Sequence, residues 1–323
     1  MLKVPSTRKE FDGFAAFYAS EIVPYLALKE ATRQAAVKKF FAVLSVGVIV
    51  GVLCAFFLPV VQFRMHALIL SLVVFSGVGY SFVRRASDDI THGIFKRICM
   101  QLKLKYRRKL DRPDYHETYR RLKLIPAHDT EEWEDEIRGE RNGGAFTICE
   151  AHLKRRSKGK NKSKRTVFHG QLIIFDYPKS FVGETVVVRD LKFANRLTKP
   201  GKGFQNVGIA SPHFEKIFEA WSTDQVEARD ILDPIVLERF EELDRLFDGA
   251  NVRAAFSGNK IYVALETGDK MNVGSMFKPL PGAERVETIL KEFDIIFDLV
   301  DVLVKQVDGR LSGAFSVDAI KAR

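Results

Sequence analysis

The sequence predicts an α+β fold: an N-terminal transmembrane helical hairpin, then a cytoplasmic mixed domain with antiparallel strands and two or three packed helices. Two uncharged apolar runs, residues 40–61 and 67–83, predict the hairpin. Short runs rich in Val, Ile, Phe and Thr, bounded by turn residues, predict strands between residues 145 and 266. Two later stretches with helical spacing of apolar residues predict packed helices.

The first apolar run is long enough to cross a bilayer. As a helix, residues 40–61 would reach about 33 Å, against a hydrocarbon core of about 30 Å. Residues 67–83 would reach only about 26 Å, the short end of the spanning range. Residues 62–66 are expected to join the two helices. A buried hairpin in a soluble core and a cleaved signal peptide are the alternatives, and the start near residue 40 disfavours the second.

Small residues predict where the two apolar helices touch, because they let helix backbones approach closely in lipid. Gly47 and Gly51 form a GxxxG pattern in the first run. In the second run the candidate contacts are Ser71, Ser76, Gly77 and Gly79.

Cations flank both outer ends of the hairpin. They are Lys29, Arg33, Lys38 and Lys39 before it and Arg84 and Arg85 after it, whereas the joining loop offers Arg64 and His66. Positive flanks stay on the cytoplasmic side, so both termini are expected in the cytoplasm. The three cysteines, Cys54, Cys99 and Cys149, have no disulfide or CxxC spacing, which agrees with that compartment.

Outside the hairpin the sequence divides by composition. We expect an amphipathic N-terminal helical segment (1–39, interrupted near Pro24), the hairpin (40–83), a basic juxtamembrane helical connector (84–128), the α+β domain (129–305) and a disordered tail (306–323). Ser87 is expected to cap the connector helix, with Asp88 and Asp89 in its first turn.

Inside the α+β domain each element has a local signal. Strands are expected at residues 145–153, 166–176, 184–189, 252–256 and 260–266. The turn Ser257-Gly258-Asn259 predicts an antiparallel hairpin. A helical stretch is expected over residues 223–247, with a capping box from Ser222 to Gln225 and a renewed start at Pro234. A final helix is expected over residues 284–305.

The net charge of +10 is concentrated in two segments. Residues 84–125 and 154–165 each carry a net charge of +8, so the remainder of the chain is negative. The cations expected to contact anionic lipid or another polyanion are Arg84, Arg85, Lys96, Arg97, Lys103, Arg107, Arg108, Lys154, Arg155, Arg156, Lys158, Lys160, Lys162, Lys164 and Arg165. A solvated loop is the alternative for the second segment. Nucleic acid is disfavoured, since that segment has no aromatic residue for base stacking.

No catalytic motif, cofactor motif or metal-binding spacing is recognisable in the sequence. The seven histidines lack the spacing of a zinc site, and His152 and His169 are the one pair expected to meet across a hairpin. The segment Pro200-Gly-Lys-Gly-Phe204 lacks the remainder of a phosphate-binding loop. We therefore assign no catalytic residue, no metal and no cofactor, and the oligomeric state stays open.

Two distinctive strings, residues 167–176 and 211–234, resemble an uncharacterised bacterial two-span membrane protein family, domain of unknown function 3137 (DUF3137). The clearest part is Thr223-Asp-Gln-Val-Glu-Ala-Arg229 followed by Ile231-Leu-Asp-Pro234. The resemblance implies a domain tethered to the bacterial inner membrane by two helices, with no established chemistry. It also implies a candidate partner, a membrane-anchored LemA-type protein.

The motif residues have ready structural roles. Asp224 and Glu227 would lie in the first turn of a helix, Arg229 would form an ion pair, and Gly170 would mark a bulge or a close backbone approach. The leading hypothesis is a membrane-anchored binding or scaffolding module. The competing hypothesis is a membrane-bound enzyme, for example a hydrolase, which requires several polar residues to converge: His169, His213, Asp224, Glu227 and Arg229.

Overall fold

The fold is that of a computed structural model. The structure describes residues 2–6, 8–59, 61–141, 143–157, 163–177, 180–190, 200–209, 211–246, 251–268 and 274–314. The chain divides into two compact units. The helical unit comprises Met1–Leu102 with Met271–Glu292, and the sheet unit comprises Lys103–Lys270 with Phe293–Arg323.

The helical unit begins with short turns that lead into one long helix. They are η1 (Lys9–Phe11), α1 (Phe14–Phe17) and the π-helical turn η2 (Tyr18–Ile22), followed by α2 (Val23–Phe57). Pro24 lacks an N–H and its ring clashes with the carbonyl of residue 20 in a regular α-helix, which a wider π turn relieves. Beyond that turn α2 runs without a break into the apolar segment.

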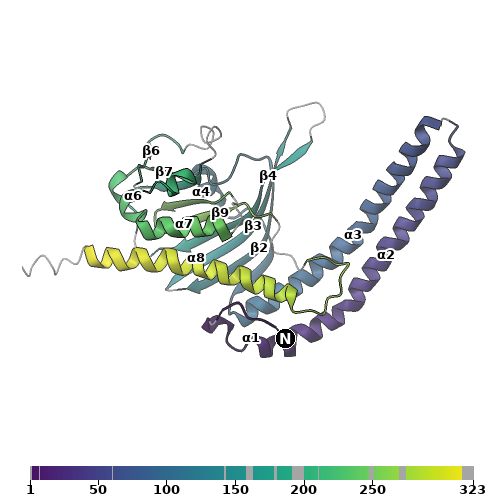
Figure 1. Cartoon of the computed structure of the whole chain (residues 1–323), viewed down its shortest axis with the longest axis horizontal. Helices are drawn as coiled ribbons and strands as arrows, with labels where there is room; N and C mark the ends of the chain where they lie inside the picture. Colours follow the sequence, from purple (N-terminus) through teal and green to yellow (C-terminus); the bar gives the residue numbers. More distant parts are fainter. Residues whose placement is uncertain are drawn as a thin grey trace, which may run out of the picture. The chain divides into compact units, whose positions relative to one another are not determined.

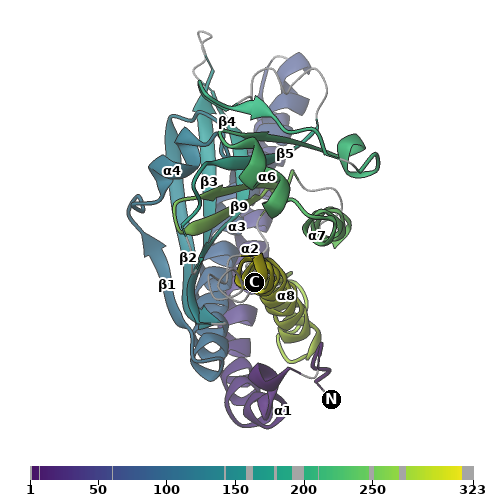
Figure 2. The same ribbon diagram turned by 90° about the vertical axis from the view of Figure 1, so that its left-hand side faces the viewer.

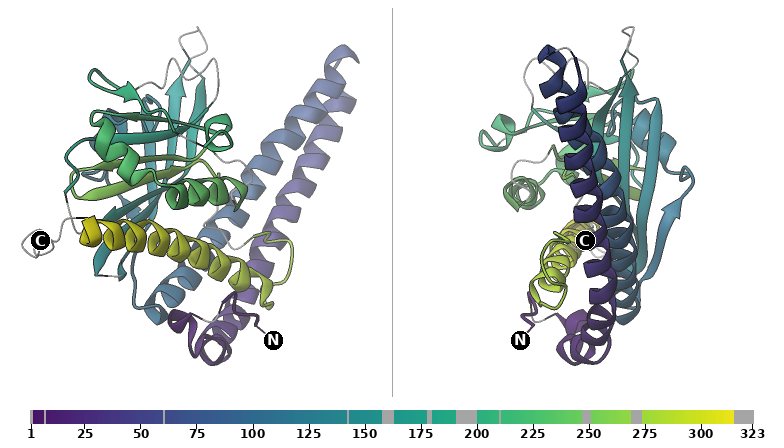
Figure 3. Two further views of the ribbon diagram at one scale, coloured as in Figure 1. Left: turned by 60° about the vertical axis from the view of Figure 1, so that its left-hand side comes forward. Right: turned by 90° about the vertical axis from the view of Figure 1, so that its right-hand side faces the viewer.

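The second long helix, α3, runs from Val61 to Gln101 beside α2 (Figures 1 and 3). The turn between them lies at Leu58 and Pro59, earlier than the expected loop at residues 62–66, which are helical. Leu58 is extended (φ −66°, ψ 124°), because the residue before a proline is driven out of the α region. Ser87 lies inside α3 and caps nothing, so the apolar segment and the first part of the expected connector are one helix.

The contact between α2 and α3 depends on small residues. Ser71 Oγ donates a 2.7 Å hydrogen bond to the carbonyl of Gly47. A Cβ on Gly47 would lie 2.5 Å from Cβ of Phe75, and one on Gly51 would lie 3.3 Å from Cα of Leu68. A Cβ on Gly77, by contrast, would meet nothing within 4 Å. The GxxxG side of α2 therefore faces α3.

By length and composition, two helices are able to cross a membrane, one ending at Phe57 and the other spanning Gln62–Gln101. Only 11% and 17% of their most apolar windows are buried within the structure. A core helix of a soluble domain would be covered on most sides. The exposed side chains include Phe41, Ile49, Phe56, Phe57, Leu70 and Val73.

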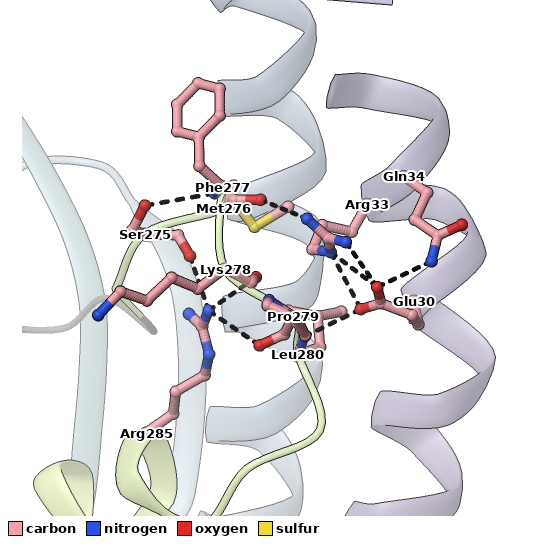
Figure 4. A network of polar contacts seen from close by, with 10 residues as sticks. All are labelled: Glu30, Arg33, Gln34, Ser275, Met276, Phe277, Lys278, Pro279, Leu280 and Arg285. Atoms are coloured by element: carbon pink, nitrogen blue, oxygen red, sulfur yellow. Dashed lines mark hydrogen bonds and ion pairs between the residues drawn. The ribbon is translucent and has the colours of Figure 1, made fainter. Parts of the chain in front are cut away.

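Residues 274–285 bind to α2 in the helical unit through a polar network (Figure 4). The Glu30 carboxylate accepts hydrogen bonds from Arg33 Nη2 at 2.6 Å and from the Leu280 amide at 2.9 Å. Arg33 Nη1 donates to the Met276 carbonyl at 2.9 Å. These donors, Arg33 first, outweigh desolvation and lower the pKa of Glu30 to about 2.

The sheet unit is built on nine strands in the part of the chain that the structure describes, all paired antiparallel in the order β1-β2-β3-β4-β9-β8-β5-β7-β6. Their bounds are β1 Lys105–Leu110, β2 Thr130–Arg141, β3 Gly144–Arg156, β4 Lys164–Asp176, β5 Thr185–Arg189, β6 Gln205–Asn206, β7 Phe218–Ser222, β8 Arg253–Ser257 and β9 Lys260–Leu265.

Helices pack on both faces of this sheet (Figure 2). On one face lies α4 (His116–Arg121), whose buried Tyr119 donates a 2.8 Å hydrogen bond to the Ile173 carbonyl. On the other face lie α7 (Pro234–Leu246) and the part of α8 (Glu284–Ala314) that belongs to this unit. Arg141 of β2 binds Asp301 of α8 at 2.5–2.6 Å and lies over the Phe297 ring.

The α+β class is confirmed, and five strands correspond to the runs expected from sequence: β3, β4, β5, β8 and β9. The hairpin between β8 and β9 also forms, with Gly258 at φ 61° in its turn. Four strands, β1, β2, β6 and β7, were not expected. In particular, Lys105–Leu110 is an edge strand, although this region was expected to be helical.

Two helix boundaries differ from expectation. The cap of α6 (Gln225–Ile231) is Asp224 and not Ser222, because the Asp224 carboxylate accepts from the amides of Val226 and Glu227. Ser222 instead ends β7. At the chain's end α8 continues to Ala314, so residues 306–314 of the expected disordered tail are helical, and the remainder of that tail lies outside the described residues.

Candidate functional site

The end of the β3–β4 hairpin carries a cluster of cations. Arg155, Arg156, Lys164 and Arg165 are exposed there, and the hairpin extends beyond its neighbours in the sheet (Figure 1). The backbone keeps its pairing to the end, since the Ser157 amide donates to the Ser163 carbonyl at 2.8 Å. Three further cations of this run, Lys158, Lys160 and Lys162, lie outside the described residues.

The register of the hairpin places like charges opposite one another. Arg155 is paired with Arg165, and Arg156 with Lys164. Like charges directly across an antiparallel pair repel and destabilise it. Because successive residues point to opposite faces, one pair lies on each face of the hairpin. An anion placed between the members of a pair would relieve the repulsion. We call these four residues the hairpin cations.

Lys154 differs from the four hairpin cations. Its Nζ lies 3.0 Å from Oε1 of Glu132 on β2. This partner balances its charge within the sheet, so Lys154 contributes less to the positive potential of the hairpin end.

The cations on α3 differ in how much they are committed to internal contacts. Arg84, Arg85 and Lys96 are exposed. Arg97 lies over the ring of Tyr25, 3.9 Å from its centroid, and donates to the Gly93 carbonyl at 3.0 Å. Arg97 therefore packs α3 against α2 and is not an open surface charge.

Lys103, Arg107 and Arg108 lie beyond α3, at the entry to β1 and within it. Lys103 is exposed and adopts a positive φ of 58° after the helix ends. Arg107 Nη2 lies 3.1 Å from Oε2 of the buried Glu136 on β2. The expected basic helical surface is thus divided between a helix and an edge strand.

The motif residues at the start of α6 hold the adjoining loop. Besides the Asp224 cap, the Glu227 carboxylate accepts from the amides of Val182 and Gly183 at 2.8 and 2.7 Å. Both carboxylates therefore bind backbone amides, whereas Arg229 is exposed. Gly170 lies on β4, where a Cβ would come within 1.9 Å of the Leu265 carbonyl oxygen of β9.

His152 and His169 meet across the β3–β4 hairpin. Their rings stack with centroids 4.2 Å apart, and the nitrogens have separate partners. His152 Nε2 lies 2.8 Å from Thr166 Oγ1, and His169 Nε2 lies 3.1 Å from Glu150 Oε1. The two Nε2 atoms therefore point to different residues, and the pair does not direct both nitrogens to one ligand position.

A second histidine cluster, which the sequence analysis missed, joins α4 to β2. His116 Nε2 lies 3.1 Å from His128 Nε2, and Oε2 of Glu131 lies 3.6 and 3.3 Å from these two nitrogens. Burial lowers the pKa of His116. Burial by itself would raise the pKa of Glu131, but hydrogen bonds from Arg112 and His128 outweigh it and lower that pKa. These three residues are ligand types for a metal ion, and none of them was a candidate site residue from the sequence.

Asp135 is a further residue that was not a candidate from the sequence. It lies at a bulge of β2, between the pairs Glu134–Glu150 and Ile137–Ile148, with φ 52°. Its carboxylate accepts a hydrogen bond from Tyr106. Burial is the main cause that raises its pKa to about 7, with repulsion from Glu150 and Glu134 adding to it.

The five polar residues that an enzyme would need to bring together come from three elements: β4 carries His169, the start of η4 (Phe214–Lys216) carries His213, and α6 with its cap carries Asp224, Glu227 and Arg229. His213 precedes the turn η4, with Nε2 3.5 Å from Glu241 of α7. His169 faces Glu150 on the sheet, and Asp224 and Glu227 bind amides at α6. Burial raises the pKa of the Cys149 thiol to about 12, which keeps it protonated and unreactive at neutral pH.

Comparison with known proteins adds a family and one structure. Residues 166–305 match a family described as "Protein of unknown function (DUF3137)", which confirms the resemblance expected from the sequence. No curated protein sequence matches the chain significantly. The crystal structure of the mycobacterial trehalose monomycolate transport factor A, TtfA, is similar at 14% identity and a TM-score of 0.33, covering 64% of this chain and 93% of that one.

Proposed function

We propose that this chain is a membrane-anchored binding module whose hairpin cations contact the anionic headgroups of a lipid leaflet. The observation that carries the proposal is the register of the hairpin, which places Arg155 opposite Arg165 and Arg156 opposite Lys164. Neither pair gains from this arrangement in isolation, because the members repel each other across the hairpin. Phosphate-bearing headgroups are anions that would offset this repulsion.

The energy available from this contact is modest for each residue and sizeable for the group. A cation near an anionic leaflet contributes about 1 kcal/mol, so the four hairpin cations together contribute about 4 kcal/mol at low salt. The anchor adds to this effect, since tethering a domain to a surface raises its effective concentration there. The interaction is electrostatic and is therefore expected to weaken as the ionic strength rises.

The proposal also includes a topology. We place the two apolar helices across the bacterial inner membrane, with both termini in the cytoplasm. Exposed Arg84 and Arg85, at the end of the second apolar run, support this orientation, since positive flanks are retained on the cytoplasmic side. Reporter fusions after Arg323 are expected to be active in the cytoplasm, and periplasmic activity would contradict the topology.

A scaffolding role requires a protein partner as well as lipid. The resemblance to the family suggests a membrane-anchored LemA-type protein as that partner. Crosslinking of the full chain in its native membrane is expected to recover such a protein. Recovery of lipid crosslinks alone would remove the scaffolding part and retain the lipid-binding part.

The lipid proposal is tested with the full chain in nanodiscs of neutral phosphatidylcholine, mixed with separate vesicles of either phosphatidylglycerol or phosphatidylcholine. The test variant carries Arg155→Gln, Arg156→Gln, Lys164→Gln and Arg165→Gln. A matched control removes four other exposed cations of the described chain, with Lys202→Gln, Lys216→Gln, Lys278→Gln and Lys291→Gln. Both variants lose the same net charge.

We expect the wild type and the control to sediment with phosphatidylglycerol vesicles at low salt and to dissociate as salt is added. The test variant should lose most of this binding. Equal binding to neutral vesicles, or equal loss in both variants, would contradict a contact made by the hairpin cations.

A further inference from the structure

The cluster formed by His116, His128 and Glu131 brings three ligand-type atoms to one point. Nε2 of each histidine and Oε2 of Glu131 lie 3.1, 3.3 and 3.6 Å from one another. All pairs of candidate ligand atoms fall within 4.8 Å, so one ion would reach them all. The three residues come from α4, from the segment after it and from β2, so the fold and not a local motif assembles them.

Hydrogen bonds around the cluster indicate which of its three facing atoms present lone pairs to a cation. His128 Nδ1 lies 2.9 Å from the carbonyl oxygen of Pro126, which only accepts, so Nδ1 carries the proton. In the neutral ring Nε2 of His128 then presents a lone pair. Oε2 of Glu131 also presents lone pairs, which leaves Nε2 of His116 as the single atom of the three that can donate. These two atoms lie 3.3 Å apart, and a positive charge joins them: either a second proton on the His128 ring, which then donates to Glu131, or a metal ion between them.

The surroundings hold these ligands in place as the outer shell of a metal site does. The Pro126 carbonyl fixes the tautomer and orientation of His128. Arg112 donates to Oε1 of Glu131, the oxygen that does not face the histidines. The Trp133 ring contacts His116 edge-on, with centroids 5.5 Å apart. The side chains of His116 and His128 are only 4% and 5% exposed, so little solvent competes for their nitrogens.

We propose that His116, His128 and Glu131 bind one Zn²⁺ ion, which joins α4 and the following segment to β2. Two imidazoles and a carboxylate form a ligand set that zinc uses with a fourth position left for water. Imidazole favours zinc and its neighbours in the first transition row over magnesium or calcium, which prefer oxygen ligands. This inference is independent of the lipid contact.

The structure contains its own comparison for this site. His152 and His169 also lie beside a carboxylate, yet their Nε2 atoms point to Thr166 and to Glu150. Replacing this second pair should not affect a zinc ion bound by the first. His152→Asn with His169→Asn is thus a control that removes as many imidazoles as the test variant does.

The experiment uses the full chain in detergent, freed of metal with a chelator. Zn²⁺ is titrated in competition with a chromophoric zinc indicator, for the wild type, for His116→Asn with His128→Asn, for Glu131→Gln and for the control. Co²⁺ is then bound to the wild type as a spectroscopic substitute for Zn²⁺, because this measurement needs no variant and so does not depend on a variant's folding.

We expect one Zn²⁺ per chain in the wild type and in the control. Loss of an outer-shell partner weakens metal sites by about 10–100-fold, so loss of direct ligands should exceed about 100-fold. The Co²⁺ complex should show visible bands of nitrogen and oxygen ligation without a thiolate charge-transfer band. Wild type that binds no Zn²⁺, test variants that bind as the wild type does, or a thiolate band would each overturn the proposal.

Discussion

Asp135 illustrates how a single carboxylate makes the stability of the folded chain depend on pH. Its pKa in the folded chain is about 7, compared with 3.8 for an ordinary aspartate. A raised carboxyl pKa means that the folded state holds its proton more tightly than the unfolded state. The associated stability is therefore complete below about pH 4 and is lost as the pH rises through about 7.

Replacing Asp135 with asparagine should stabilise the sheet unit at alkaline pH. Asparagine tolerates the positive φ of 52° and still accepts from Tyr106, but it carries no charge. The gain is on the order of a few kcal/mol above pH 7 and shrinks toward pH 4, since each pKa unit corresponds to about 1.4 kcal/mol. Thermal unfolding of Asp135→Asn and wild type in one detergent, at pH 8 and pH 5, measures it. A difference independent of pH would contradict this account.

One of the two histidine clusters could be predicted from the sequence and the other could not. His152 and His169 could be paired because both lie in strands with a recognisable hairpin between them. The cluster of His116, His128 and Glu131 could not, because it depends on α4 packing back against the sheet. The one local signal, His128 three residues before Glu131, has meaning only when a third ligand is brought to it by the fold.

At the scale of elements, apolar strands could be predicted and charged ones could not. β4, β5 and β9 are largely buried and rich in Val, Ile and Phe, and β3 and β8 carry buried Ala and Phe, which is the pattern that sequence analysis detects. β2 has the sequence Thr-Glu-Glu-Trp-Glu-Asp-Glu-Ile-Arg-Gly-Glu-Arg, in which few side chains are apolar, and a bulge shifts its alternation at Asp135. β1 is a basic edge strand, where exposed cations also suit the unpaired side.

The α2–α3 contact predicts that alanine has different effects on the stability of the helix pair at Gly47 and at Gly77. A methyl group at Gly47 would lie 2.5 Å from Cβ of Phe75, whereas at Gly77 it would meet nothing within 4 Å. Gly47→Ala should therefore destabilise the helix pair by about 1–3 kcal/mol through overpacking. Gly77→Ala should be neutral or stabilising by up to about 1 kcal/mol, because alanine favours a helix over glycine.

Thermal unfolding of both alanine variants in detergent, followed by circular dichroism, gives the comparison. The helical signal of Gly47→Ala should be lost at a lower temperature than that of the wild type. Equal shifts at the two positions would show that Gly47 does not lie in a close contact.

The segment 274–285 depends on Glu30, whose carboxylate accepts from Arg33 and from the Leu280 amide. Glu30→Gln should weaken both bonds, so hydrogen exchange at the Leu280 amide should accelerate by about 10-fold or more, as a charged hydrogen bond contributes about 1.5–3 kcal/mol. Glu21→Gln, an exposed position in the preceding turn, is the control.

The pH dependence of this segment has the opposite sign to that of Asp135. The lowered pKa of Glu30, about 2 in place of 4.5, means that its contribution is complete above about pH 4.5 and is lost as the pH falls toward 2. Exchange at Leu280 that is the same in the wild type and in Glu30→Gln would contradict the network.

At the scale of the whole molecule, two apolar helices and a mixed sheet unit lie in one chain with a net charge of +10. The proposed lipid contact would account for both features, since hydrocarbon would cover the exposed apolar side chains and anionic headgroups would neutralise the hairpin cations. The length and composition of the apolar runs were readable from sequence. The location of the turn at Pro59 and the division of the basic segment between α3 and β1 required the structure.

The most direct measurement of the central claim is alkaline carbonate extraction of membranes from bacterial cells that make the full chain. The account predicts that the wild type stays in the membrane pellet and is released only by detergent. A variant with Ile49→Arg and Val73→Arg, at side chains that are 58% and 62% exposed, should be inserted poorly, because a charge at the bilayer centre is costly. Wild-type chain that is released into the carbonate supernatant would contradict membrane anchoring.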